Sequence, residues 1–307
     1  MRITLRQLEI FAAIARSENV SRAAEALAMS QSAASSALVE LERQFDCPLF
    51  DRIGKSLRLN STGRGLLPQA EDMLARAADL EGYLAGGILG PLAVGATLTI
   101  GNYLATLVVA EYLHRYPASR IGLHVANTQH IVEQIIRYEL DVGLIEGESD
   151  HPDLLLEPWL DDALVVFCAP HHPLAMIGDA DNASLKAQNW IVRERGSGTR
   201  ALFDRVVAKA LPDLHIQLEL EHTEAIKRAV ESGLGVGCLS RLSLREAFRR
   251  GSLVEIGTPQ FNLGRQFYFA RHRQRQLSPA ARTFLALCRE YTGDAGATDS
   301  LPLPPIR

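Results

Sequence analysis

The stretch SRAAEALAMSQSAASSALVELERQF, residues 21–45, decides how the start of this chain folds. Its first part predicts a short helix with Ser21 as the cap, because a Ser side chain accepts hydrogen bonds from the free N–H groups of a helix start. A turn at Met29 leads to a second cap, Ser30, and to a longer helix over 31–45. A short helix, a turn and a longer helix are the helix-turn-helix pattern, whose second helix enters the major groove of DNA.

The longer helix has two chemically different faces. Ala34, Leu38 and Leu41 recur at helical spacing and predict its buried stripe. The candidates for DNA contact lie on the other face and on the preceding helix: Arg22, Gln31, Ser32, Ser35 and Ser36. Gln pairs with adenine through two hydrogen bonds, and a Ser hydroxyl serves several bases. The alternative is a solvated helix face, which would explain an isolated Ser-rich helix better.

A basic segment follows this helix. Residues 52–60 alternate like a short hairpin, and Arg52, Lys55 and Arg58 on such a wing would reach phosphates. Taken alone, a short basic run is explained equally well by a solvated loop. Beside a helix-turn-helix, the DNA-binding interpretation is favoured.

The charge of the chain is divided by segment. The 307 residues carry a formal net charge of -4, which alone would argue weakly against a nucleic-acid partner. Residues 1–64, however, hold nine Lys/Arg and seven Asp/Glu, whereas residues 65–88 hold one Lys/Arg and four Asp/Glu. Residues 89–307 hold 22 Lys/Arg and 25 Asp/Glu. The basic excess therefore lies on the predicted DNA-binding segment.

Composition excludes several classes of protein. Hydrophobic residues make up 47% and charged residues 22%, which is ordinary for globular proteins and excludes a wholly disordered chain. No apolar run approaches the roughly 20 residues that span a bilayer, and the charged first residues do not resemble a secretory signal. The four cysteines form no CxxC pair, which favours a cytoplasmic location.

No motif of a catalytic or metal centre stands out. The sequence contains no GxSxG, GxxxxGK[ST] or HExxH pattern. The pair His171-His172 is a weak metal candidate, because adjacent side chains on a strand point apart. Cys238 fits a core position better than a redox switch. We therefore expect no enzyme activity, no catalytic residues, no metal and no cofactor.

A helix over 65–88 is predicted to join two subunits. Its apolar residues are spaced 4-3-4-3-4, which is typical of a heptad seam: Leu66, Ala70, Met73, Ala77, Leu80 and Leu84. The alternative is a helix that packs on its own domain. The glycines that follow mark a boundary to the next domain.

Residues 92–293 alternate short apolar strands with helical segments, which predicts an α/β fold of parallel sheets with helices on both faces. Such sheets bind ligands beyond the carboxyl ends of their strands. The candidates there are mostly small or polar: Thr97, Thr99, Ile100, Asn127, Glu146, Ser197 and Thr199. Singly, the polar ones are best explained as helix caps, and only their convergence favours a ligand cleft.

The N-terminal motifs resemble the LysR-type transcriptional regulators. The matching pieces are Leu5-Arg6-Gln7-Leu8, Ser21-Arg22-Ala23-Ala24-Glu25-Ala26-Leu27, Ser30-Gln31 and Pro48-Leu49-Phe50-Asp51-Arg52. The family usually has Pro after the Ser-Gln pair and often a basic residue after the following Ser, where this chain has Ser32 and Ser36. Phosphate contacts should therefore depend more on the wing.

The resemblance continues through the α/β region. Its pieces there are Leu140-Asp141-Val142-Gly143-Leu144-Ile145-Glu146-Gly147 and Arg195-Gly196-Ser197-Gly198-Thr199-Arg200, closest to the branch that regulates carbon fixation and sulfur metabolism. Sulfate-binding relatives tend to have Thr near the third strand, where this chain has Glu146. A carboxylate opposes an anion unless it is paired, and Arg193, Arg195 or Arg200 could pair with it. That substitution leaves open a ligand with its own hydroxyl or amine.

The family implies a division of the chain and a set of partners. The implied parts are a winged helix-turn-helix over 1–64, a linker helix over 65–88, an effector domain over 89–293 and a disordered tail over 294–307. The effector domain would divide into subdomains of about 92–161 plus 266–293 and about 162–265, as in periplasmic binding proteins. The implied partners are promoter DNA, a small anionic metabolite as co-inducer, RNA polymerase, and further copies in a homodimer and homotetramer. A solute-binding protein of a transport system is the rival interpretation of 92–293.

Overall fold

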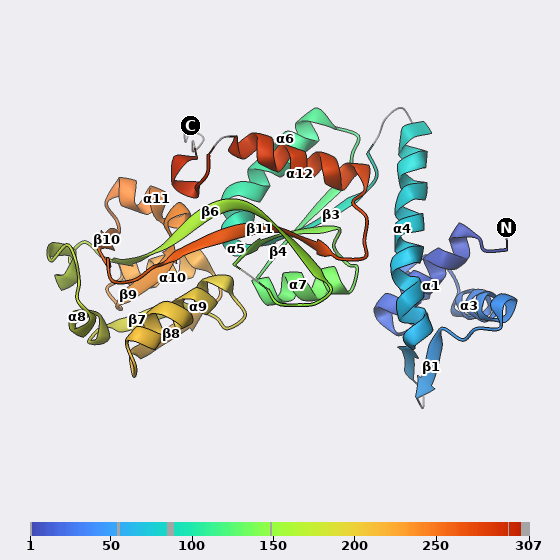
Figure 1. The fold of residues 1–307 in the computed structure, drawn as a ribbon, viewed down its shortest axis with the longest axis horizontal. Coiled ribbons are helices and arrows are strands. Elements are labelled where there is room, and N and C mark those ends of the chain that lie inside the picture. Colours follow the sequence, from blue (N-terminus) through green and yellow to red (C-terminus); the bar gives the residue numbers. More distant parts are fainter. Residues whose placement is uncertain (1, 54–55, 85–88, 148, 294, 302–307) are drawn as a thin grey trace.

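The computed structural model describes residues 2–53, 56–84, 89–147, 149–293 and 295–301. Figure 1 shows a small helical domain and a long helix at one end and a two-part α/β domain at the other. The mixed α/β class predicted from the sequence is confirmed.

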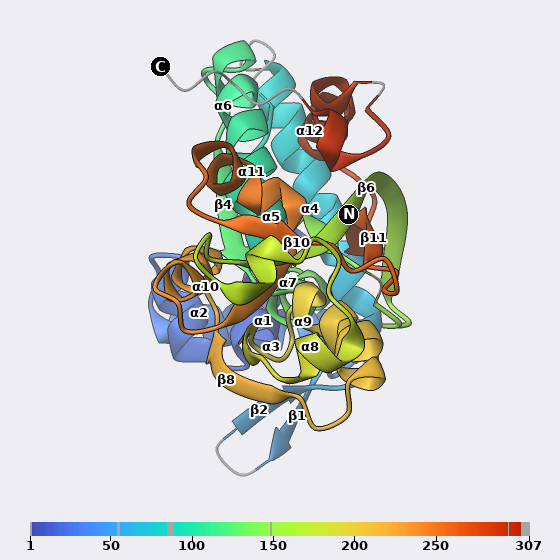
Figure 2. The same cartoon turned by 90° about the vertical axis from the view of Figure 1, so that its left-hand side faces the viewer.

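The N-terminal domain is a three-helix unit with a hairpin. Its elements are α1 (Leu5–Ser17), α2 (Val20–Ala26), α3 (Gln31–Phe45), β1 (Phe50–Ile53) and β2 (Ser56–Leu59). Ala34, Leu38 and Leu41 are buried as predicted, and Phe11 of α1 meets Phe50 edge to face with ring centroids 5.9 Å apart. The antiparallel hairpin projects from the end of the molecule in both views (Figures 1 and 2).

Local capping was only partly predicted. Ser30 caps α3, because its side chain accepts a hydrogen bond from the Ala33 N–H. The prediction that Ser21 caps the second helix was wrong, because the Asn19 side chain accepts from the Ser21 and Arg22 N–H groups and α2 starts at Val20. Both residue types are good caps, so composition alone did not separate them.

The two halves of helix α4 (Ser61–Leu84) have different surroundings. Its first half packs against α1 and buries Leu67 and Ala70 in the N-terminal core. In its second half Met73, Leu80 and Leu84 are 46%, 60% and 76% exposed. These three apolar side chains of the predicted seam are therefore exposed in the half of α4 that extends beyond the N-terminal domain.

The α/β domain contains one nine-stranded sheet in the order β4-β3-β5-β11-β6-β9-β7-β8, with β10 on β6. Its strands are β3 (Leu92–Thr97), β4 (Ile121–Ala126), β5 (Val142–Glu146), β6 (Leu154–Cys168), β7 (Asn189–Arg193), β8 (His215–Leu220), β9 (Val236–Ser240), β10 (Val254–Ile256) and β11 (Gly264–His272). The two halves are parallel, as predicted, and β6 and β11 run antiparallel to each other and to their neighbours. These two long strands cross between the halves, so the sheet is continuous.

Helices cover both halves of this sheet. The first half has α5 (Leu98–Ile100), a π-helical turn at 101–105, α6 (Thr106–Arg115), α7 (Thr128–Ile136) and α12 (Pro279–Thr292). The second half has a 3-10 turn at 173–176, α8 (Asn182–Lys186), α9 (Gly198–Phe203), a π-helical turn at 204–208, α10 (Thr223–Glu231) and α11 (Arg241–Arg250). None of the described helices is both long and apolar enough to cross a membrane.

Tyr138 joins the α/β domain to the N-terminal domain. It follows α7 with a left-handed backbone (φ 60°), which costs an aromatic residue some strain, yet it is 6% exposed and packs in the N-terminal core. Its hydroxyl lies 3.0 Å from Nδ1 of His272, the last residue of β11. The two domains thus share a buried side chain.

The predicted disordered tail was wrong for residues 295–301. Thr298 is buried and donates to the Asp162 carboxylate at 2.8 Å, and Leu301 lies in the core of the first half. The Arg245 guanidinium also donates to the Leu301 carbonyl. Pro-rich composition suggested disorder, but these contacts hold the segment in place. The parts of the prediction on 294 and 302–307 lie outside the described residues.

Replacing Leu301 by Ala should lower the free energy of unfolding by about 2–3 kcal/mol, because the side chain leaves a buried cavity. Met176→Ala is the control, since Met176 is 88% exposed and should change stability by no more than about 0.5 kcal/mol. Urea unfolding followed by circular dichroism measures both. Equal stabilities of the two variants would show that the segment is not part of the core.

Candidate functional site

Helix α3 presents a polar outer face. Gln31, Ser32 and Ser36 are exposed, Ser35 is partly buried, and Arg22 is exposed on α2. The Ser32 and Ser30 hydroxyls lie 3.1 Å apart, so Ser32 also belongs to the start of the helix. This face can offer amide and hydroxyl groups to base edges.

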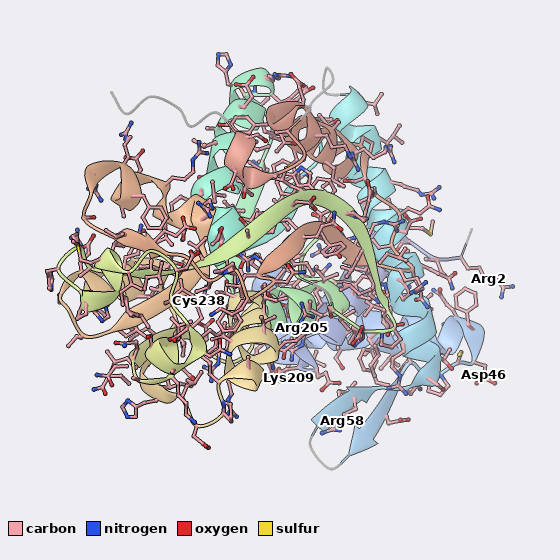
Figure 3. The ribbon with its side chains drawn as sticks, turned by 60° about the vertical axis from the view of Figure 1, so that its left-hand side comes forward. Arg2, Asp46, Arg58, Arg205, Lys209 and Cys238 are labelled. Atoms are coloured by element: carbon pink, nitrogen blue, oxygen red, sulfur yellow. The ribbon has the colours of Figure 1, made fainter. Side chains whose placement is uncertain are left out.

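The hairpin of the same domain carries an exposed basic side chain. Arg58 on β2 is exposed and lies well away from Cys238 in the α/β domain (Figure 3). Arg64 is used differently, since its guanidinium donates to the Leu59 carbonyl. The predicted phosphate contacts of Lys55 and of the Arg52 side chain lie outside the described residues.

At the junction of the two halves of the α/β domain, Glu146 is the centre of a buried hydrogen-bond network. It is the last residue of β5 and is 2% exposed. One carboxylate oxygen accepts from the Thr99 N–H at 2.8 Å. The other accepts from the Thr199 hydroxyl at 3.1 Å and from Arg265 Nη1 at 2.7 Å. Strand ends and a crossover strand therefore meet at one carboxylate.

The pairing partner of Glu146 differs from the prediction. Arg265 of β11 holds it, whereas Arg193 pairs with Glu194, and Arg200 pairs with Asp204 and Glu219. Burial alone would raise the pKa of Glu146, but the Arg265 and Arg193 charges, with hydrogen bonds from Thr99, lower that pKa to about 2. Glu146 is consequently ionised at neutral pH.

Arg265 ties a second carboxylate into the same network. Its Nε donates to Asp162 of β6 at 2.7 Å, and Asp162 also accepts from the Ser240 and Thr298 hydroxyls, each at 2.8 Å. Arg265 Nη1 further donates to the Thr199 hydroxyl at 3.0 Å, while Nη2 is buried without a partner among the described atoms. The Arg265 guanidinium also lies over the Phe267 ring, with its central carbon 5.3 Å from the ring centroid.

Other predicted residues fall into three groups. Thr97 is buried, with its hydroxyl 3.4 Å from the Leu144 carbonyl, and Ser197 is buried at the start of α9 without capping it. Asn127 caps α7, the local role left open by the sequence. The Ile100 side chain is fully buried in the core of the first half, and its effector contact stays a prediction.

The two halves touch directly beside this network. The Gln129 N–H donates to the Gly196 carbonyl and the Gly198 N–H donates to the Thr128 hydroxyl, each at 3.1 Å. A Cβ on Gly198 would lie 2.1 Å from the Glu146 carbonyl oxygen, so only glycine permits this approach. A hollow of about 520 Å³ opens beside these contacts and is lined in part by Gln129 of the first half and by Arg195 and Ser197 of the second.

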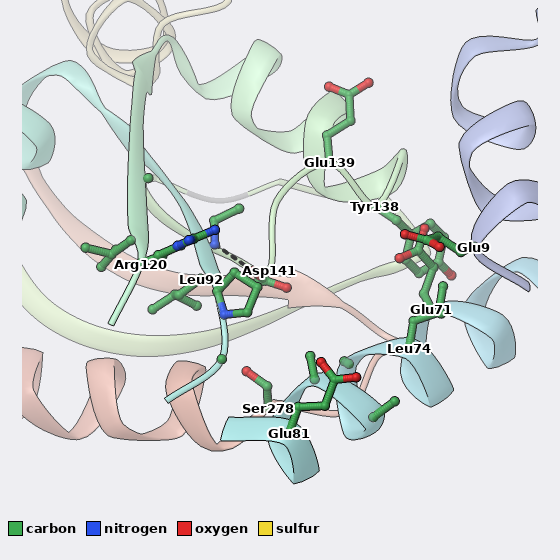
Figure 4. Close-up of a pocket in the computed structure, with 18 of the residues that line it drawn as sticks. Glu9, Glu71, Leu74, Glu81, Leu92, Arg120, Tyr138, Glu139, Asp141 and Ser278 are labelled. Carbon is green, nitrogen blue, oxygen red and sulfur yellow. Dashed lines mark hydrogen bonds between the residues drawn. The ribbon is translucent and has the colours of Figure 1, made fainter. Parts of the chain in front are cut away.

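A larger hollow, of about 980 Å³, lies elsewhere. Figure 4 shows it between α4, which carries Glu71 and Glu81, and the first half of the α/β domain, which carries Arg120 and Asp141. Several of its charges are already paired, including Glu71 with Arg16 at 2.5 Å and Asp141 with Arg275. We interpret it as the joint between the domains rather than as a ligand site.

Cys238 lies in the core, as its sequence context indicates. Burial raises the pKa of the Cys238 thiol to about 12, which keeps it protonated and unreactive. Within the same residues, no group of three or more His, Cys, Asp and Glu side chains is arranged to hold a metal ion.

Comparison with known proteins gives the same two-part division. Residues 5–64 match the family described as bacterial regulatory helix-turn-helix protein, lysR family, and residues 85–293 match the LysR substrate binding domain. The HTH-type transcriptional regulator YeiE of Escherichia coli K12, itself described as uncharacterized, is 43% identical over 94% of this chain and 98% of its own length. The relatives are transcriptional regulators and not enzymes.

Other relatives fall in the predicted branches. The activator CmpR of Synechocystis is 31% identical over 92% of this chain and 93% of its own. The regulator CysL of Bacillus subtilis is 29% identical over 85% of this chain and 89% of its own length. The resemblance to regulators of carbon fixation and sulfur metabolism is thereby confirmed.

Solved structures share the architecture. Full-length OxyR from Pseudomonas aeruginosa, solved as a point mutant, matches 100% of this chain and 99% of its own, with a TM-score of 0.72 and 24% identity. The regulatory domain of Synechocystis CcmR, solved in complex with 2-PG, matches 66% of this chain and 98% of its own, with a TM-score of 0.60 and 30% identity. The chain therefore belongs to the LysR family of DNA-binding transcriptional regulators, with a helix-turn-helix domain followed by an effector-binding domain.

Proposed function

We propose that this regulator controls promoters in the cytoplasm in response to a small acid bound at the junction of its two effector subdomains. The single observation that carries the proposal is the buried network of Glu146, Thr199 and Arg265, which joins both subdomains and leaves one guanidinium nitrogen unpartnered among the described atoms. The CcmR regulatory domain, solved with the small anion 2-PG, supports an acidic ligand.

The effector would act by shifting an existing equilibrium. Contacts such as Gly198 to Thr128 hold the subdomains together, and a ligand that binds one closure angle better than another changes their populations. In a dimer, and in a homotetramer made of two dimers, that change would alter the spacing of the DNA-binding domains and the recruitment of RNA polymerase. The exposed apolar residues Met73, Leu80 and Leu84 of α4 support self-association.

For DNA recognition, we propose Gln31, Ser32, Ser35 and Ser36 as base contacts and Arg22, Arg52, Lys55 and Arg58 as phosphate contacts. The exposed face of α3 supports the first group, and the exposure of Arg22 and Arg58 supports two of the second. Phosphate contacts position a protein without reading sequence, whereas base contacts specify it.

Arg58→Ala should weaken binding to all duplexes alike and lower the slope of log affinity against log salt by about 1 per half-site, because one phosphate contact releases about one counterion. Arg250→Ala removes an exposed charge from the effector domain and is the matched control. Fluorescence anisotropy over a salt series measures both. An unchanged slope for Arg58→Ala would refute the wing assignment.

Thr99→Val combined with Thr199→Val should abolish the response to effector while sparing DNA binding, because Glu146 loses the hydroxyl that links the subdomains. Thr106→Val, at an exposed position, is the control. Anisotropy with promoter DNA, with and without candidate acids, gives both readouts. A normal response of the double variant would place the effector site elsewhere.

Leu80→Glu with Leu84→Glu should shift the protein toward monomer at micromolar concentration, because charges would enter the proposed seam. Sedimentation velocity measures the change, with Met176→Glu, on an exposed turn, as the control. If the double variant sediments like the unaltered protein, α4 does not carry the association.

A further inference from the structure

The wing, the hairpin of β1 and β2, is short and depends on its base for its direction. Its two strands have four residues each. A two-stranded hairpin is at best marginally stable on its own in water. Arg58 lies on the second strand, directly opposite Asp51 of the first. The direction of the Arg58 side chain relative to α3 therefore depends on how the residues at the base of the hairpin are held.

Glu42 of α3 holds the first strand of the wing. Its carboxylate accepts a hydrogen bond from the Leu49 N–H at 2.7 Å, and its backbone carbonyl accepts one from the Cys47 N–H at 3.0 Å. Leu49 is buried, and a buried N–H without an acceptor is costly. One residue of α3 thus makes two hydrogen bonds to the segment that leads into β1.

Asn60 holds the second strand. Its N–H donates to the Leu49 carbonyl at 3.1 Å, and its side-chain nitrogen donates to the Pro48 carbonyl at 2.8 Å. Its side-chain oxygen accepts from the Gly63 N–H at 2.9 Å, in the first turn of α4. A Cβ on Gly63 would lie 2.3 Å from the Leu49 carbonyl oxygen, so α4 begins directly against the base of the wing. Leu49 is therefore held by Glu42 through its N–H and by Asn60 through its carbonyl.

The charge of Glu42 is unfavourable for a direct contact with DNA. It lies on the second helix of the helix-turn-helix, the one that enters the major groove, where a carboxylate is repelled by phosphates. The neighbouring Arg43 pairs with Glu40 at 2.8 Å and not with Glu42. The presence of Glu42 is better explained by the N–H that it holds than by a contact with the duplex.

We propose that Glu42 is a positioning residue for DNA binding. By holding the Leu49 N–H, it fixes the direction of the wing relative to α3, so that Arg58 reaches a phosphate while the outer face of α3 meets base edges. Glu42 acts through Arg58 and does not touch the duplex. The inference rests on the proposed phosphate contact of Arg58. The hydrogen-bond acceptor is the property that matters at this position, so Gln can replace Glu42 and an apolar side chain of similar length cannot.

Glu42→Gln and Glu42→Met test this role as a matched pair. Both remove the negative charge and keep a straight side chain that suits a helix, but only Gln keeps an acceptor for the Leu49 N–H. Arg58→Ala is added to each, and fluorescence anisotropy with a mixed-sequence duplex gives the slope of log affinity against log salt. Arg58→Ala should lower this slope by about 1 per half-site in the unaltered protein and with Glu42→Gln. With Glu42→Met it should lower the slope by less than about half of that, because the two positions are coupled.

Arg22→Ala is the control, because Arg22 is exposed on α2 and is not part of the wing. The change that it makes to the slope in the unaltered protein should be the same with Glu42→Gln and with Glu42→Met. If Glu42→Met weakens the effects of Arg22→Ala and Arg58→Ala equally, the whole domain is disturbed and the positioning role is overturned.

The outcomes separate this inference from the proposed function. If Arg58→Ala leaves the slope of the unaltered protein unchanged, the wing contact fails and the role of Glu42 falls with it. If Arg58→Ala has equal effects with Glu42→Gln and Glu42→Met, the wing contact stands and only the role of Glu42 is overturned. A thermal melt checks that each variant is folded, and Glu42→Ala replaces Glu42→Met if the latter is not. Unfolding of both beside a folded Glu42→Gln would show that the contact serves folding, which would also overturn the inference.

Discussion

The pairing of Arg265 with two buried carboxylates is the constraint on which the effector domain depends. Glu146 ends a strand of the first subdomain, Asp162 lies on one crossover strand and Arg265 on the other. Losing one member would leave a buried charge unpaired, which costs several kcal/mol in typical proteins. Arg265 therefore links the two crossover strands through Asp162 and offsets the negative charge of Glu146. It also donates a hydrogen bond to the Thr199 hydroxyl of the second subdomain.

Local features of this chain were predictable from sequence because neighbouring residues determine them. The stripe of Ala34, Leu38 and Leu41 and the Ser30 cap are confirmed, since helical periodicity and capping act within a few residues. The parallel halves of the sheet followed from the alternation of strands and helices. The cap at Asn19 was missed because Asn19 and Ser21 are equally suitable by residue type.

The hydrogen-bond network around Glu146 was predicted only in part. Strand-end position identified Glu146, Thr99 and Thr199, but the cation was assigned to nearby arginines, whereas Arg265 lies 119 residues further along the chain. That pairing depends on the register of β11 beside β5 and β6, which local patterns do not encode. The packing of Thr298 on Asp162 was missed for the same reason, because a short segment acquires order through distant contacts.

The shared side chain Tyr138 has a mechanical consequence for signalling. Helix α7 touches the second subdomain at its start, through Thr128, and Tyr138 enters the N-terminal core just beyond its end. Strand β11 likewise carries Arg265 near one end and His272, the partner of Tyr138, at the other. A nine-residue helix is a stiff arm about 13 Å long. Helix α7 and strand β11 therefore both run from the junction of the two subdomains to the Tyr138–His272 contact, so one helix and one strand connect that junction to the N-terminal domain.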